Sequence, residues 1–97
     1  MSGSVMVPVV FQNDGSEEVE LMWHDYAGNL VSYGKIAPRA SKSMSTYATH
    51  PWSIKANTGT YIINGKDVWV PTENDKDKTV HIGKRVHYTE SIIKLDV

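Results

Sequence analysis

The stretch VMVPVVFQNDGSEEVELMWH, residues 5–24, decides the fold class of this chain. Val9 and Phe11 fall on one face of an extended segment, and Val19 and Leu21 fall on one face of the next. A period of two is typical of half-buried β-strands, and apolar residues at helical spacing are missing. The intervening NDGSE is rich in turn-forming residues, so the two segments are predicted to pair as a β-hairpin.

The same short-strand pattern continues along the rest of the chain. Further strand-like runs are LVSYGKIAP, SMSTYAT, WSIKA, TYIINGKDVWV, TVHIGKRVHY and SIIKLDV. The pair Asn64-Gly65 predicts a tight reversal, since these residue types tolerate positive φ. Turn signals about every 8–12 residues are typical of a sandwich or small barrel. We therefore predict an all-β fold, a seven- to eight-stranded antiparallel β-sandwich, as one domain over residues 1–97.

Composition excludes several partner classes. The chain has 97 residues, no cysteine and a formal net charge of -1. Scattered basic residues predict neither nucleic acid nor membrane as a partner. Without cysteine there is no disulfide framework or thiolate metal site, and the four histidines lack metal-ligand spacing, so no metal is expected. The N-terminal residues lack a basic region and no apolar run reaches membrane-spanning length, which favours a cytoplasmic location.

No catalytic constellation is recognisable in the sequence. It has no glycine-flanked nucleophile, no phosphate-binding loop and no HExxH helix. The carboxylates gather in two turn-like segments, NDGSEE and PTENDKDK, where solvated charge is the simplest interpretation. We therefore expect a protein that is not an enzyme and that needs no cofactor.

Aromatic residues are concentrated in the middle of the chain. They are Trp23, Tyr26, Tyr33, Tyr47 and Trp52. Such residues serve equally in a core or in the wall of a site, and the pattern alone leaves both open. The segment STYATHPW, residues 45–52, adds Thr46 and His50, each able to donate or accept a hydrogen bond. An aromatic box with one such pair suits a small, mostly apolar ligand that carries a hydroxyl.

At these positions the chain resembles the β-domain of the von Hippel–Lindau family. The resemblance runs without a gap through FQNDGSEEVELMWHDYAGNLVSYGKIAPRASKSMSTYATHPW, from Phe11 to Trp52, and resumes at INGKDVWVP, residues 63–71. A weaker similarity covers TVHIGKRVHYT. That β-domain is a seven-stranded sandwich that recognises 4-hydroxyproline in a partner peptide. The resemblance therefore implies a non-catalytic module that binds a hydroxyproline-containing peptide or protein.

The resemblance also implies a set of ligand-binding residues. The aromatic walls that hold the pyrrolidine ring match Trp23, Tyr33 and Trp52. Thr46 stands where the family has a serine, and His50 matches a histidine; these two groups hydrogen-bond the ligand hydroxyl. Tyr47 matches a tyrosine beside the peptide path. Ser45 replaces a histidine, which puts the flanking contacts in question.

The sequence departs from the family in one respect and leaves two other functions open. The family's helical domain, which docks Elongin C, has no counterpart in the sequence, so no Elongin C partner through that route is expected. The alternative function is carbohydrate binding on the same scaffold, with Asp25, Asn29 and Ser32 as extra polar partners near Trp23. A third possibility is a structural domain that has kept the fold without a ligand.

Overall fold

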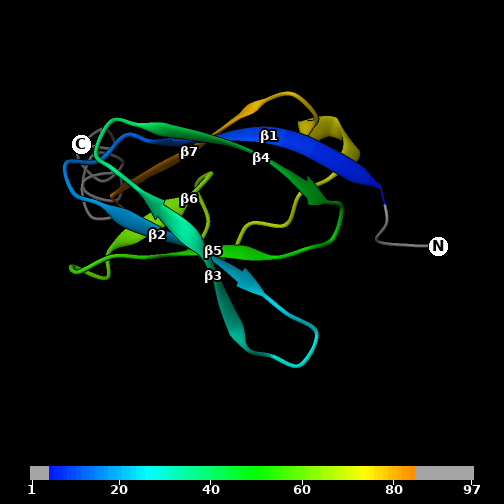
Figure 1. Cartoon of the computed structure of the whole chain (residues 1–97), viewed down its shortest axis with the longest axis horizontal. Helices are drawn as coiled ribbons and strands as arrows, with labels where there is room; N and C mark the ends of the chain where they lie inside the picture. The colour runs from blue at the N-terminus through cyan, green and yellow to red at the C-terminus, as the bar shows by residue number, and fades with distance from the viewer. Residues whose placement is uncertain (1–4, 85–97) are drawn as a thin grey trace, which may run out of the picture.

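The computed structural model describes residues 5–84, and in them two β-sheets pack face to face (Figure 1). The four-stranded sheet has the order β4-β1-β7-β6, and the three-stranded sheet has the order β3-β2-β5. The strands are β1 (Met6–Asn13), β2 (Val19–His24), β3 (Leu30–Ile36), β4 (Ser41–Tyr47), β5 (Trp52–Lys55), β6 (Tyr61–Ile63) and β7 (Thr79–Lys84). The predicted all-β sandwich is confirmed.

The described residues contain one helical segment, the 3-10 turn η1 (Glu73–Asp75). It belongs to the charged loop PTENDKDK, and the Thr72 backbone N–H donates to the Asp75 carboxylate across 2.8 Å. Between residues 5 and 84, no helix has the length and apolar character needed to cross a membrane. The predicted strand SIIKLDV lies outside the described residues.

The predicted hairpin between the first two strands is wrong. Strand β1 belongs to the four-stranded sheet and β2 to the three-stranded sheet, so the NDGSE turn carries the chain from one layer to the other. Asn13 is fully buried at this crossover. Its side-chain Nδ2 donates to the backbone carbonyls of Glu17 and Ile36, and its side-chain Oδ1 accepts from the backbone N–H of Gly15. Turn-forming residues mark a reversal, but they do not specify which sheet the next strand enters.

Strand pairing is antiparallel except between β1 and β7, which run parallel with Phe11 opposite Val80. The reversal at Asn64-Gly65 is confirmed, because both residues have positive φ, 51° and 80°. Two backbone hydrogen bonds of 2.9 Å join Ile63 and Lys66 across it. These features are those of a two-residue type I′ turn.

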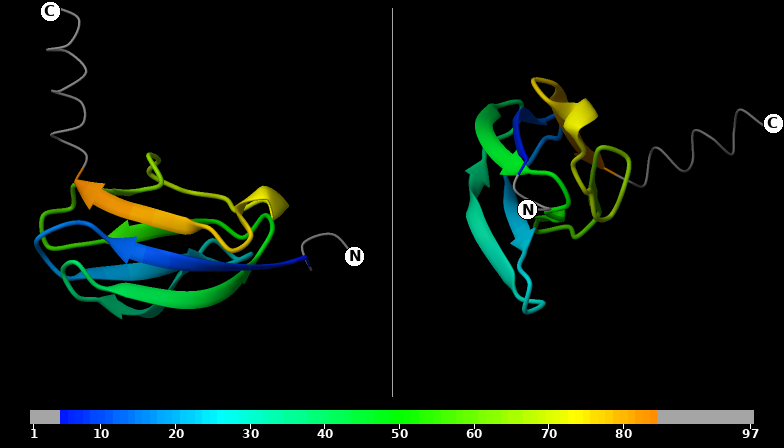
Figure 2. Two further views of the ribbon diagram at one scale, coloured as in Figure 1. Left: turned by 90° about the horizontal axis from the view of Figure 1, so that it is seen from above. Right: turned by 90° about the vertical axis from the view of Figure 1, so that its right-hand side faces the viewer.

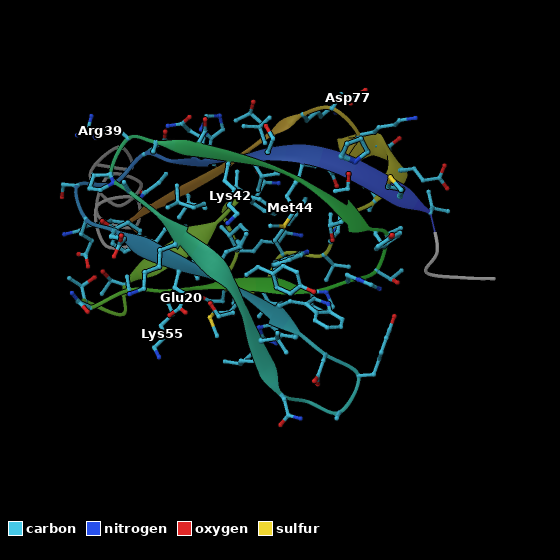
Figure 3. All side chains as sticks on the ribbon, viewed as in Figure 1. Glu20, Arg39, Lys42, Met44, Lys55 and Asp77 are labelled. Atoms are coloured by element: carbon cyan, nitrogen blue, oxygen red, sulfur yellow. The ribbon has the colours of Figure 1, made fainter. Side chains whose placement is uncertain are left out.

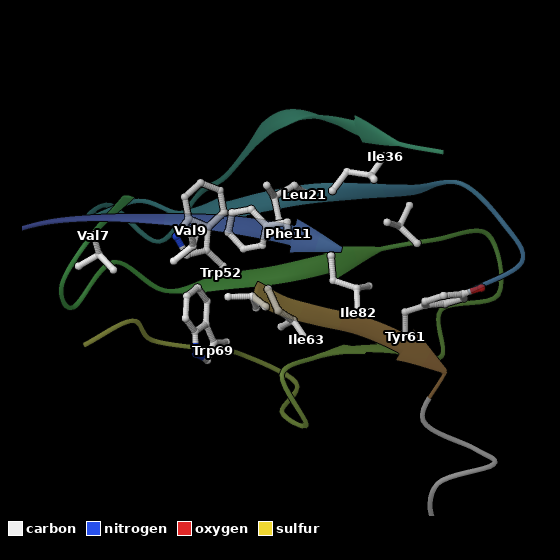
Figure 4. Close-up of a cluster of buried hydrophobic side chains, with 12 residues drawn as sticks. Val7, Val9, Phe11, Leu21, Ile36, Trp52, Tyr61, Ile63, Trp69 and Ile82 are labelled. Carbon is white, nitrogen blue, oxygen red and sulfur yellow. The ribbon is translucent and has the colours of Figure 1, made fainter. Parts of the chain in front are cut away.

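The core between the sheets is built from the alternate residues that the sequence pattern marks (Figure 4). Val9 and Phe11 from β1 face Val19 and Leu21 from β2, all four at most 3% exposed. At its centre the Phe11 ring packs against two indoles, those of Trp52 at 5.6 Å and Trp69 at 6.0 Å between ring centroids.

Strands β3 and β4 form edges of their sheets; they lie close together where the loop of residues 37–40 joins them, and they diverge from there (Figures 1 and 2). Lys42 of β4 reaches across to β3, where its ammonium lies against the backbone of Gly34. Figure 3 shows Met44 pointing between the sheets, while Glu20 and Lys55 lie on the outside of the three-stranded sheet. Thr46 and Tyr47 follow Met44 along β4.

Candidate functional site

One pocket brings together all six side chains that the resemblance implied. It has a volume of about 90 Å³ and is lined by Trp23, Tyr33, Ser45, Thr46, Tyr47, His50 and Trp52. Pockets that bind drug-sized ligands have volumes of roughly 300–1,000 Å³, so this pocket suits one small ring rather than a larger molecule. The lining residues come from both sheets: β2, β3 and β5 on one side, and the end of β4 with the following turn on the other.

The turn after β4 aims His50 at the pocket. His50 N donates to the Tyr47 carbonyl across 3.2 Å, and Thr49 adopts the left-handed conformation with φ 72°. Thr49 N also donates to the Pro71 carbonyl across 3.1 Å. The turn is thus fixed to a segment more than 20 residues away, which holds His50 in one place.

Strand register places the tryptophans. Trp23 of β2 lies directly opposite Trp52 of β5 in an antiparallel pair. Trp52 in turn exchanges two backbone hydrogen bonds of 2.8 Å with Trp69. The cross-strand position of Trp23 and Trp52 sets two walls of the pocket side by side.

The aromatic rings form a box in which two of the four ring contacts are edge-to-face and two are tilted. The Trp23 ring meets Tyr33 edge-on at 6.1 Å and lies at 33° to the His50 ring at 5.4 Å. Tyr33 meets Trp52 at 5.2 Å and 76°, and Tyr47 meets His50 at 5.3 Å. Edge-to-face pairs of this spacing stabilise each other, so the walls are preformed. The indole N–H of Trp23 is buried and makes no hydrogen bond with any described residue.

The sequence left open whether the aromatic residues belong to the core or to a site. Trp52 belongs to both. It is 3% exposed and packs on Phe11, while it also lines the pocket. Its indole Nε1–H donates to Thr46 Oγ1 across 2.8 Å. Thr46 is 2% exposed, and after this bond its hydroxyl keeps its own hydrogen and one lone pair for another partner.

Tyr26, for which the sequence predicts no specific role, has its hydroxyl 2.9 Å from His50 Nε2. The two residues are 24 positions apart, and no local motif could have linked them.

The polar residues suggested for a sugar ligand, Asp25, Asn29 and Ser32, do not line the pocket. Asp25 accepts two backbone hydrogen bonds within its own loop, and Ser32 donates to Glu20 across 2.5 Å. Over residues 5–84, no three histidines or carboxylates lie close enough together to hold a metal ion.

Residues 5–84 thus form a β-sandwich with a small aromatic pocket that is lined by a hydroxyl and an imidazole. The comparison with protein families identifies this domain: a model of the VHL β-domain matches residues 1–77, and the chain belongs to this family. The VHL β-domain is a substrate-recognition, protein-binding domain and not a known catalytic family. The search of curated proteins gives no match.

Proposed function

We propose that this chain binds proteins through a 4-hydroxyproline residue, held in the pocket between the two sheets. The observation that supports this most directly is the convergence of the aromatic box with Thr46 and His50 in one small pocket. A pyrrolidine ring presents polarised C–H groups that pack well on aromatic faces. Its 4-hydroxyl finds one hydroxyl and one imidazole as hydrogen-bonding partners.

Burial makes the pocket selective for the hydroxylated ring. Thr46 is almost completely buried, and a bound ring removes water from His50 as well. An unmodified proline leaves both groups without the partner that water supplied, at a cost of about 1–3 kcal/mol. A hydroxyproline replaces that water, so the hydroxyl should determine the affinity.

A peptide suits the site better than a free amino acid because of the adjacent sheet edge. Strand β4, which carries Thr46 and Tyr47, pairs with β1 on one side and with no described strand on the other. An extended peptide can therefore lie along β4 while its hydroxyproline enters the pocket. A sugar ligand has no comparable support, because Asp25, Asn29 and Ser32 do not line the pocket.

The test compares two peptide libraries that differ only in one oxygen atom. Each peptide carries a central 4-hydroxyproline or a central proline between randomised neighbours, and enriched sequences are re-measured by calorimetry. We expect hydroxyproline peptides to bind at least about 10-fold more tightly than their proline twins. Equal affinity for the two forms contradicts the proposal.

The matched variants are His50→Ala, in the pocket, and Lys55→Ala, at an exposed position on β5. His50→Ala should abolish the preference for hydroxyproline with little change in melting temperature, since His50 packs at the pocket rather than in the core. Lys55→Ala should bind as the parent does. Loss of binding in both variants would argue against this pocket.

A further inference from the structure

Tyr26 contacts the candidate pocket from outside it. It lies in the loop between β2 and β3, is 84% exposed and is not among the pocket-lining residues. Its ring nevertheless meets His50 edge-on at 5.7 Å and Trp23 edge-on at 6.1 Å. Its hydroxyl oxygen lies 2.9 Å from His50 Nε2. Tyr26 therefore touches two pocket residues and shares a hydrogen bond with one of them, His50.

The loop that carries Tyr26 is held by its own hydrogen bonds. Asp25 Oδ1 accepts from Ala27 N across 2.9 Å and from Asn29 N across 2.8 Å. Asp25 N donates to the Asn29 carbonyl across 2.9 Å, and Gly28 adopts φ 87°, a conformation that glycine takes without strain. Tyr26 thus projects from a braced turn, which keeps its hydroxyl beside His50.

The chemistry of a phenol and an imidazole favours one of the two possible directions of this bond. A phenol O–H is a good donor, whereas the phenol oxygen is a weak acceptor because its lone pair is shared with the ring. A neutral imidazole has one acceptor and one N–H, and the partner of one nitrogen decides the state of the other. With Tyr26 donating to Nε2, the proton must reside on Nδ1.

We propose that Tyr26 is a positioning residue that holds His50 in the Nδ1–H tautomer. Within residues 5–84, the His50 ring has no other hydrogen bond, so Nδ1–H is the polar group left for a ligand. His50 then acts as a donor and requires a ligand oxygen that accepts. Thr46, which already accepts from Trp52, completes the pair through its remaining lone pair or its own hydrogen.

The first test reads the tautomer directly and needs no ligand. Long-range ¹H–¹⁵N NMR spectra at a pH of about 8.5, where histidines are neutral, distinguish the two ring nitrogens. In the parent, His50 should show a protonated Nδ1 and an acceptor Nε2. In Tyr26→Phe, which removes only the hydroxyl, the proton should shift substantially to Nε2, the form that an unpartnered imidazole favours.

Two controls separate this effect from a general disturbance. His24 bonds to Ser53 Oγ across 2.7 Å, a bond in which Tyr26 takes no part, so the nitrogen shifts of His24 should change little. Tyr47→Phe removes a hydroxyl from another ring that packs on His50 but is not hydrogen-bonded to it. It should leave the His50 tautomer as in the parent. A parent His50 that is protonated on Nε2, or a Tyr26→Phe spectrum identical to the parent, overturns the proposal.

The second test concerns the ligand and rests on the proposed function. With the hydroxyproline peptides found above, Tyr26→Phe should weaken binding about fivefold while leaving affinity for the proline twins unchanged. An equal loss of affinity for both peptide forms would mean that Tyr26 contacts the peptide backbone or the residues beside the hydroxyproline. This result would overturn the positioning role of Tyr26 in binding. If no hydroxyproline peptide binds the parent, the proposed function fails, and the NMR result alone decides the tautomer.

Discussion

At the scale of single residues, Trp52 joins the hydrophobic core to the candidate pocket. Its ring packs on Phe11, and its N–H donates to the buried hydroxyl of Thr46. The same side chain therefore stabilises the fold and orients a pocket residue. This double role explains why composition and spacing alone could not decide between core and site.

Replacement of Trp52 by Phe tests this double role. Trp52→Phe should lower the free energy of unfolding by about 2–4 kcal/mol, because a cavity forms and Thr46 Oγ1 loses its donor. It should also weaken any ligand that binds Thr46. Chemical denaturation gives the first quantity and peptide titration the second.

Trp69→Phe is the matched control for that variant. Trp69 is equally buried, at 3%, and also packs on Phe11, but it does not line the pocket. Its replacement should cost stability through the cavity alone and leave peptide binding as in the parent. If both variants lose binding equally, the pocket depends on general core integrity and the specific role of Trp52 is refuted.

At the scale of single elements, the turn between β6 (Tyr61–Ile63) and Lys66 shows how local chemistry sets structure. Asn64 and Gly65 both have positive φ, and a Cβ placed on Gly65 would have no neighbour within 4 Å. Any cost of a side chain at Gly65 therefore arises from the backbone conformation and not from crowding. Such a turn is recognisable in sequence because only its own residues determine it.

Gly65→Ala should destabilise the fold by about 1–2 kcal/mol, the cost of the left-handed conformation for a residue with a Cβ. The control is Gly83→Ala in β7, where the added Cβ is equally uncrowded but no positive φ is required. This second variant should be neutral or stabilising by about 0.4–1 kcal/mol. Urea unfolding of the two variants side by side measures the difference, and equal stabilities would refute the backbone explanation.

At the scale of the whole molecule, the decisive feature is the passage of the chain from one sheet to the other after β1. The side chain of Asn13 bonds to the carbonyls of Glu17, Ile36 and Ala37 across 2.9, 3.0 and 3.2 Å. It thereby ties the end of β1 to the end of β3 in the opposite sheet. A buried amide with this many partners is costly to remove.

Asn13→Ala should therefore lower the free energy of unfolding by about 2–4 kcal/mol, since several carbonyls lose their donor at once. Gln12→Ala is the neighbouring control. The Gln12 amide lies at longer distances, 3.3 and 3.4 Å, from its acceptors, and the residue is only half-buried. It should change stability by less than about 1 kcal/mol. Thermal unfolding of both proteins measures this, and a small effect of Asn13→Ala would show that the crossover does not depend on its side chain.

The sequence by itself indicated strands within residues 5–84, the Asn64-Gly65 turn and the family. The alternation of apolar residues and the turn chemistry depend only on near neighbours in the sequence. The family resemblance, which has no gap from Phe11 to Trp52, identified the six residues that line the pocket. Only the tertiary structure decided which sheet each strand joins, and it replaced the predicted β1–β2 hairpin with a crossover held by Asn13. It also paired Tyr26 with His50 and Trp52 with Thr46. The physical reason is that such contacts join residues distant in sequence, whose approach is set by how the two sheets pack and not by any local pattern.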